Sequence, residues 1–127
     1  MQHKVYTKIR RLWDEDNDGI LEWTVFIQEK IDGSNLSIWK KDWELFVWSR
    51  TQTVGTDKIK NGFRGAVDYI NETINLSLLA LFDELEKNNK TEDVRFFGEW
   101  LVRHTIWDYN IDAYNHFYLF DIEVDGV

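Results

Sequence analysis

The chain has 127 residues and a net charge of −8, from 15 Lys and Arg against 23 Asp and Glu. This length fits one compact domain, and a hydrophobic content of 43% excludes a disordered chain. Zero cysteines exclude disulfides, thiolate zinc sites and cysteine nucleophiles. The charge balance excludes a wholly basic nucleic-acid binder. Residues 1–64 carry 11 basic and 10 acidic side chains and residues 65–127 carry 4 and 13, so we expect a polyanion to contact the first half.

No secretory or membrane signal is recognisable in the sequence. The first residues, MQHKVYTKIRRLW, are too polar for a signal peptide, and the most apolar stretch, residues 76–82, is too short to span a bilayer. We therefore expect a cytoplasmic protein without a membrane partner.

Three strands are predicted in the first half of the chain. Residues 23–31 alternate in side-chain character, which predicts a strand that ends at the turn cluster Asp32-Gly33-Ser34. Residues 35–40 and 43–50 are predicted as an antiparallel hairpin joined by Lys41-Asp42.

The second half predicts a helix between strands. Within residues 76–87, apolar side chains recur at i, i+3, i+4 and i+7, a stripe that faces a core: Leu78, Leu81, Phe82 and Leu85. Asn88 and Asn89 are expected to end this helix. Strands are predicted over residues 94–101 and 116–124. Strands, then a helix, then strands indicate an α+β domain of mainly antiparallel sheet with packed helices.

Two possible metal signals are weak. Residues 14–19, DEDNDG, imitate the start of a calcium-binding EF-hand loop, but the loop position that requires a bidentate glutamate is Val25. We favour a solvated acidic turn there. The three histidines, His3, His104 and His116, lack metal-ligand spacing.

The sequence EKIDGSN, residues 29–35, is the strongest chemical signal. Lys30 is placed at the end of an apolar strand, immediately before the turn around Gly33, and strand ends bring side chains to the rim of a sheet. A lysine acts as a nucleophile only when its amine is neutral. The alternative is a surface ion pair of Lys30 with Glu29 or Asp32.

Three further motifs follow in order: Ser49-Arg50-Thr51, FFGEW at residues 96–100 and FYLFDI at residues 117–122. With these elements the chain resembles the covalent nucleotidyltransferase superfamily of polynucleotide ligases and capping enzymes. Within it, the closest likeness is to ATP-dependent RNA ligases of the nick-sealing branch. The segment Tyr6-Thr7-Lys8-Ile9 also resembles the lead-in of such ligases.

The resemblance implies a three-step reaction that uses ATP and Mg²⁺. A lysine attacks the α-phosphate of ATP and forms lysyl-AMP, AMP passes to an RNA 5′-phosphate, and a 3′-hydroxyl then seals the strand. Basic side chains in the first half are the expected RNA contacts, although a solvated basic face explains them equally well: Lys4, Lys8, Arg10, Arg11, Lys58, Lys60 and Arg64.

The resemblance also assigns roles to residues. Lys30 is the implied nucleophile, and Glu99 is implied to hold ribose hydroxyls or a hydrated metal ion. Phe120 is expected to stack on the purine, or else to belong to the core. Asp121 is expected on the opposite strand face, in contact with metal or RNA. The implied nucleotide-binding set and the neighbouring motif residues are Glu29, Ile31, Asn35, Arg50, Glu99 and Phe120, with Asp32 and Gly33.

The family continues to a fourth motif with a metal-binding carboxylate and a fifth with paired lysines, and neither is recognisable here. No lysine follows Lys90. We therefore expect residues 1–127 to be a single, truncated adenylyltransferase domain that at most binds nucleotide, with little or no self-adenylylation. Uncovered apolar sheet surface then favours self-association. A DNA ligase, a capping-type nucleotidyltransferase and a non-catalytic nucleotide-binding or interaction module are the alternatives.

Overall fold

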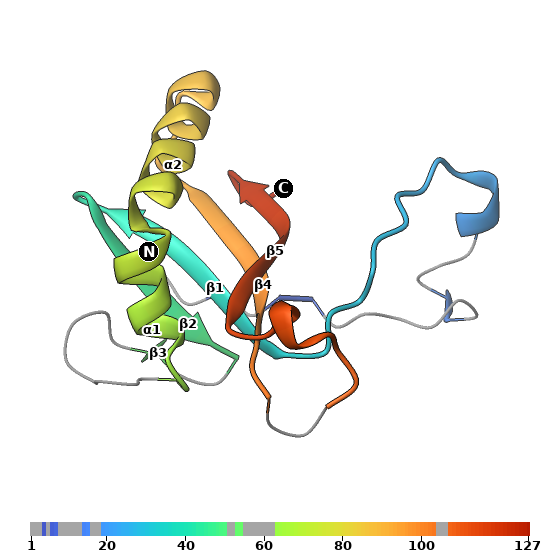
Figure 1. The fold of residues 1–127 in the computed structure, drawn as a ribbon. Coiled ribbons are helices and arrows are strands. Elements are labelled where there is room, and N and C mark those ends of the chain that lie inside the picture. The colour runs from blue at the N-terminus through green and yellow to red at the C-terminus, as the bar shows by residue number, and fades with distance from the viewer. Residues whose placement is uncertain are drawn as a thin grey trace.

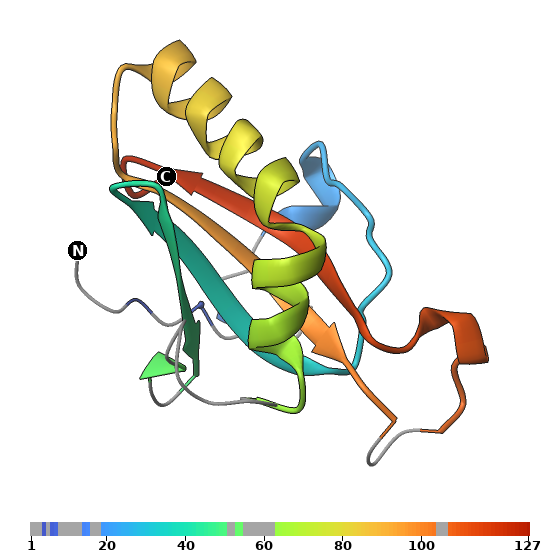
Figure 2. The same cartoon turned by 60° about the vertical axis from the view of Figure 1, so that its left-hand side comes forward.

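The computed structural model describes residues 4, 6–7, 14–15, 19–50, 53–54, 63–103 and 107–127. It contains a five-stranded sheet with helices across one face (Figures 1 and 2). The strands are β1 (Ser34–Lys41), β2 (Glu44–Ser49), β3 (Thr53–Val54), β4 (Val94–Leu101) and β5 (His116–Val124). Their order is β3-β2-β1-β4-β5, and neighbouring strands pair antiparallel. The predicted α+β class is confirmed.

The β1–β2 hairpin closes through a two-residue turn. Lys41 pairs with Glu44, and Asp42 and Trp43 between them have φ angles of 49° and 68°. Positive φ at both central residues is typical of the type I′ turn, whose twist suits a hairpin. The predicted hairpin is confirmed, with its turn one residue later than predicted.

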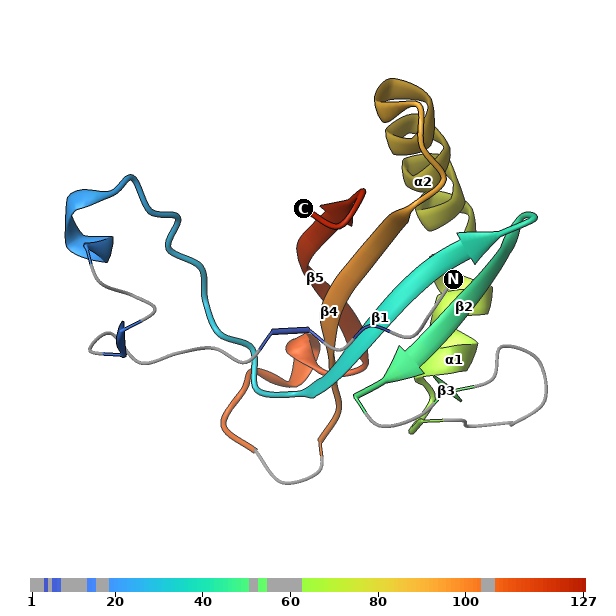
Figure 3. The same ribbon diagram turned by 180° about the vertical axis from the view of Figure 1, so that it is seen from behind.

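Helices α1 (Ala66–Asp68) and α2 (Asn75–Asn89) are joined by the π-helical turn η3 (Tyr69–Thr73). The predicted apolar stripe of α2 faces the sheet: Phe82 is fully buried and stacks on Phe96 of β4, with ring centroids 4.0 Å apart. The helix ends at Asn89, as predicted, and the next residue, Lys90, caps it in a left-handed conformation. Figure 3 shows the opposite side, where the sheet lies in front of the helices. In the described part of the chain, no helix is long and apolar enough to cross a membrane.

Strands β4 and β5 have the predicted bounds, but a bulge interrupts their pairing. Phe97 pairs with Asp121 and Gly98 pairs with Leu119, which leaves Phe120 as an extra residue in β5. A bulge shifts the alternation of side chains by one residue, so strand neighbours can share a face.

The predicted strand over residues 23–31 is wrong. These residues follow the short 3-10 turn η2 (Ile20–Glu22) and form no strand. In this region the chain projects away from the sheet (Figure 1). Phe26 and Ile27 are 92% and 93% exposed. Alternating side chains favour an extended backbone, but a strand also needs a hydrogen-bonding neighbour. The sequence pattern supplies only the first requirement.

Gly98 provides a test of the bulge. A Cβ atom here would collide with the Phe117 ring and lie 2.5 Å from the carbonyl oxygen of Tyr118. We expect Gly98→Ala to lower the free energy of unfolding by about 1–3 kcal/mol through overpacking, measured by urea denaturation. Gly126→Ala is the control, because Gly126 has a φ of +81° and nothing within 4 Å of the added atom. Its loss, from backbone strain alone, is expected to be about 1 kcal/mol. Equal losses in both variants would contradict the close approach at Gly98.

Candidate functional site

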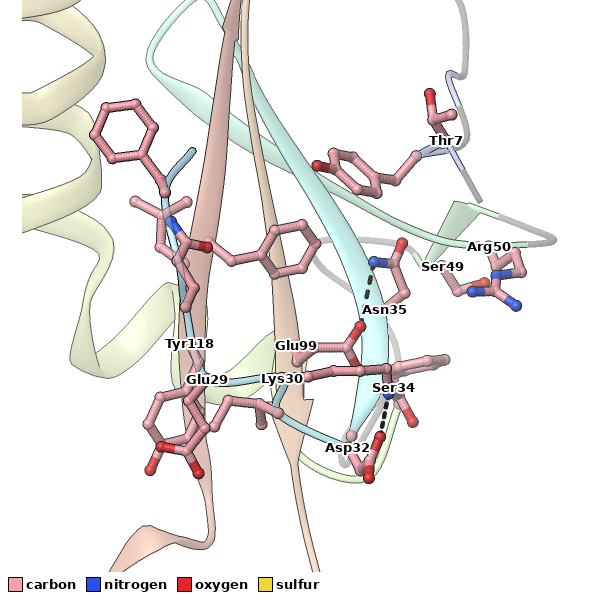
Figure 4. Close-up of a pocket in the computed structure, with 18 residues that line it drawn as sticks. Thr7, Glu29, Lys30, Asp32, Ser34, Asn35, Ser49, Arg50, Glu99 and Tyr118 are labelled. Carbon is pink, nitrogen blue, oxygen red and sulfur yellow. Dashed lines mark hydrogen bonds and ion pairs between the residues drawn. The ribbon is translucent and has the colours of Figure 1, made fainter. Parts of the chain in front are cut away.

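A cavity of about 1140 Å³ opens where residues 26–33 meet β1, β4 and β5 (Figure 4). Segments that are far apart in the sequence contribute to its lining. It includes most of the residues singled out by sequence: Glu29, Lys30, Ile31, Asp32, Gly33, Asn35, Arg50, Glu99 and Phe120. Asp121 is the exception. The cavity therefore brings together motifs that the family resemblance implied to act together.

The register of β1 against β4 positions the floor of this cavity. Asn35 lies directly opposite Glu99, and its side-chain amide donates to the Glu99 carboxylate at 3.4 Å. The backbone N–H of Gly33 also donates to this carboxylate. A side chain at Gly33 would collide with the backbone of Trp100. Glycine is therefore required for the turn to approach β4 this closely.

Lys30 lies at the exposed rim of the cavity. Its side chain is 68% exposed and forms an ion pair with Asp32 (Figure 4). The hydrogen bond and the charge of Asp32 raise the pKa of Lys30 above its usual value, with a smaller contribution from Glu99. The ion pair expected as the alternative to a nucleophile is thus present, and it favours the protonated amine. A nucleophilic Lys30 has to leave Asp32 and lose its proton first.

Glu99 is the half-buried acid of the site. Burial raises its pKa, while hydrogen bonds from Asn35 and Gly33 and the positive charges of Lys30 and Arg50 act in the opposite direction. Burial is the largest of these influences, so the net pKa of Glu99 lies above its usual value. A nearby cation or a donor from a ligand would therefore stabilise the charged form.

Arg50 faces the same cavity from the end of β2. The side chain is exposed, and Figure 4 shows it beside Ser49, to the right of Asn35 and Glu99. Its positive charge acts on Glu99. Two cationic side chains thus act on one carboxylate, and together they can bind an anion while the carboxylate accepts hydrogen bonds.

The expectation that Phe120 and Asp121 occupy opposite strand faces is wrong, because the bulge in β5 turns both toward Tyr6. The Tyr6 ring lies 4.9 Å from the Phe120 ring, and its hydroxyl donates to Asp121 at 2.8 Å. The Tyr6 ring also contacts Phe97, at 5.0 Å. Burial, together with the hydrogen bond and charge of Asp121, raises the pKa of Tyr6 to about 12. Asp121 is thus engaged by Tyr6 rather than facing the cavity.

Sequence reasoning missed two tyrosines of this region. Tyr118 lies opposite Glu99 in the β4–β5 ladder and lines the cavity. It belongs to the FYLFDI motif, so its position could have been found from the strand alternation. The hydroxyl of Tyr109 accepts the backbone N–H of Asp32 at 2.9 Å. No spacing in the sequence indicates this contact, because 77 residues separate the two positions.

The predicted RNA-contacting residues are only partly described. Lys4 forms an ion pair with Glu123 at 2.5 Å, and Arg64 has an exposed side chain. Five others lie outside the described residues, as does Thr51: Lys8, Arg10, Arg11, Lys58 and Lys60. The acidic turn of residues 14–19 is described only at its ends. Within the ranges that are described, no three His, Asp or Glu side chains are grouped to hold a metal.

Comparisons with known proteins give one positive result. A family model described as RNA ligase matches residues 24–126. The searches of curated proteins and of solved structures each gave no match. The matched range includes all the residues that line the cavity except Tyr6 and Thr7.

The raised pKa of Glu99 leads to a prediction about stability. A folded-state pKa above the unfolded value gives a contribution that is present at low pH and is lost as pH rises through the folded-state pKa. We therefore expect Glu99→Gln, which cannot ionise, to be more stable than the wild type at pH 7–8 and no more stable near pH 4. Urea denaturation across this range measures the difference. The exposed Glu92→Gln is the control and should show no such advantage. A constant difference across pH would contradict the burial argument.

Proposed function

The chain belongs to the RNA ligase family, and from this we propose that it joins RNA strands with ATP through a covalent AMP adduct on Lys30. The observation that carries the proposal is the convergence of Lys30, Arg50 and Glu99 on one cavity of about 1140 Å³. Such a volume accommodates a ligand of nucleotide size. The three residues come from three motifs that are far apart in the sequence. Their meeting at one cavity is therefore not expected by chance.

The first step is attack on ATP. Lys30 separates from Asp32 and loses one proton to give a neutral amine. Its Nζ forms a bond to the α-phosphorus, the bond from that phosphorus to the bridging oxygen breaks, and pyrophosphate leaves. The attacking nitrogen gives up a second proton, which leaves a phosphoramidate. The negative charge of the phosphates attracts the guanidinium of Arg50, which suits oxyanions.

The next two steps transfer AMP and seal the strand. An oxygen of an RNA 5′-phosphate attacks the AMP phosphorus, and the P–N bond breaks as the Lys30 amine takes up a proton. The 3′-hydroxyl of the other RNA end then attacks the activated 5′-phosphate, loses its proton and displaces AMP. In this proposal the substrate is a nick or a pair of aligned RNA ends. Sealing assays on matched RNA and DNA nicks test that choice, and sealing of DNA alone would favour the DNA ligase alternative.

The nucleoside would occupy the part of the cavity that Phe120 lines. Phe120 provides an aromatic face for the purine, a contact typically worth about 1–3 kcal/mol. Glu29 and Ile31 flank the nucleophile and can contact the base through backbone or side chain. Asn35 holds the Glu99 carboxylate, and that carboxylate can accept hydrogen bonds from ribose hydroxyls. A capping-type enzyme would use the same parts with a different purine.

Magnesium suits this site only as a hydrated ion. Glu99 is the half-buried acidic side chain of the cavity, and the described residues include no cluster of three acids or histidines. Glu99 would hold the ion through water, with the ATP phosphates as its other ligands. When bound, the ion neutralises charge on the triphosphate.

The experiment that tests this function follows label from ATP carrying a radioactive α-phosphate. We expect the wild-type chain to bind ATP in calorimetry and to take up label slowly in the presence of Mg²⁺, because the sequence has no lysine after Lys90. Lys30→Ala should abolish the label. Lys87→Ala is the matched control, since Lys87 also forms an ion pair, with Asp83, but lies on α2. Label that persists in Lys30→Ala, no label on the wild type, or no ATP binding by the wild type would overturn the proposal.

A non-catalytic interaction module is the second candidate, favoured by one observation. Leu21, Phe26 and Ile27 are 84%, 92% and 93% exposed on the segment that projects from the sheet. In this alternative, residues 23–31 of one chain pair with the edge strand β5 of a second copy. β5 ends the described sheet and has nine residues, the length of the predicted strand.

Sedimentation equilibrium distinguishes this alternative from a monomer. If it is right, the wild type dimerises with increasing concentration, more strongly at high salt because the net charge of −8 opposes association. Ile27→Asp should then raise the dissociation constant of the dimer by about tenfold or more. Leu76→Asp is the control, since Leu76 is 82% exposed on α2 and the charge change is the same. A monomer at all concentrations would exclude the pairing.

A further inference from the structure

A hydrogen bond joins the nucleophile motif to the connection between β4 and β5. The backbone N–H of Asp32 donates to the hydroxyl of Tyr109 at 2.9 Å. Asp32 in turn holds the Lys30 amine in an ion pair. One tyrosine hydroxyl from a distant segment therefore contacts the turn that carries the proposed nucleophile.

Tyr109 is itself held by a buried partner. Its backbone N–H donates to the hydroxyl of Tyr114 at 3.2 Å, and the two rings pack edge to face with centroids 6.1 Å apart. Tyr114 is only 5% exposed. Next to it, Asn115 donates its backbone N–H to the carbonyl of Leu101 in β4 at 2.7 Å. The hydroxyl that meets Asp32 is thus connected to the sheet through short, direct contacts.

We propose that Tyr109 is a positioning residue for adenylylation: its hydroxyl fixes the Asp32 backbone and so places Lys30 at the rim of the cavity. This inference rests on the proposed function. It assigns a role to a residue outside the motifs that carry the family resemblance, on the connection between FFGEW and FYLFDI.

The exposure of Lys30 explains why such a support matters. A lysine side chain that is 68% exposed has little packing to hold it, so the location of its amine depends on the backbone of the turn. Within that turn, Gly33 lies against the backbone of Trp100, and the Tyr109 hydroxyl holds the backbone of the preceding residue, Asp32. A misplacement of about 1 Å between reacting atoms can reduce a rate by about 100-fold.

The electrostatic setting gives a second reason. The charged or titratable groups that act on Lys30 are Asp32, Glu99 and Tyr109, and all three favour its protonated form. Asp32 has the strongest effect. A turn released by loss of the Tyr109 hydroxyl would weaken the Asp32 contact, which makes the amine easier to deprotonate but leaves it less well aligned. Easier deprotonation changes the pH at which the rate is half-maximal, whereas poorer alignment lowers the rate itself, so the two effects can be separated.

The test compares Tyr109→Phe with Tyr69→Phe. Both variants lose one hydroxyl and keep the ring. The Tyr69 hydroxyl bonds to His116 at 3.3 Å, and Tyr69 does not line the cavity.

For Tyr109→Phe we expect the initial rate of Lys30 labelling at saturating ATP to fall on the order of tenfold, with the ATP concentration at half-maximal rate unchanged. The pH at which the rate is half-maximal should move lower, and hydrogen exchange of the Asp32 amide should accelerate. Tyr69→Phe should match the wild type in all four measurements.

The outcomes separate the inference from the function on which it rests. If the wild type is labelled on Lys30 and Tyr109→Phe labels at the same rate with the same amide exchange, the positioning role is wrong and the proposed function stands. If the rate falls but both the half-maximal pH and the Asp32 exchange stay unchanged, Tyr109 affects only the folded fraction, and the positioning role is again wrong. If the wild type takes no label on Lys30, the proposed function fails first.

Discussion

The antiparallel pairing of β1 with β4 is the constraint on which the rest of the site depends. It sets Asn35 opposite Glu99, and it requires the turn before β1 to approach Trp100 so closely that only Gly33 fits. Lys30 lies three residues before that glycine. The position of the proposed nucleophile is therefore determined by strand pairing in the centre of the sheet rather than by contacts of its own side chain.

The charged side chains of the site suit the binding of an anion better than nucleophilic attack by Lys30. Asp32 favours the protonated form of Lys30, and the half-buried Glu99 experiences the positive charges of Lys30 and Arg50. In this state the cavity offers the positive charges of Lys30 and Arg50 to an anion. In the proposed reaction, Lys30 would have to leave Asp32 and lose a proton before it could act as a nucleophile.

Aromatic side chains complete the site through a local irregularity. The bulge between β4 and β5 turns Phe120 and Asp121 to the same side, where Tyr6 contacts both. The N-terminal residues described around Tyr6 thus pack on the last strand, 115 residues away in the sequence. A regular strand would have sent one of the two side chains to the opposite face, and the pairing with Tyr6 would be lost.

The sequence by itself determined the local features of the chain. The spacing of Leu78 and Phe82 predicted α2, and local residue patterns predicted β1, β2, β4 and β5, because these signals reside in neighbouring positions. The resemblance of the ordered motifs to a known family implied which residues would converge. Only the tertiary structure decided which extended segments have a strand neighbour, and residues 23–31 have none among the described strands. It also decided the shared face of Phe120 and Asp121 and the contact of Tyr109 with Asp32. Register, bulges and contacts over 77 residues depend on how distant backbones meet, and no local pattern encodes that.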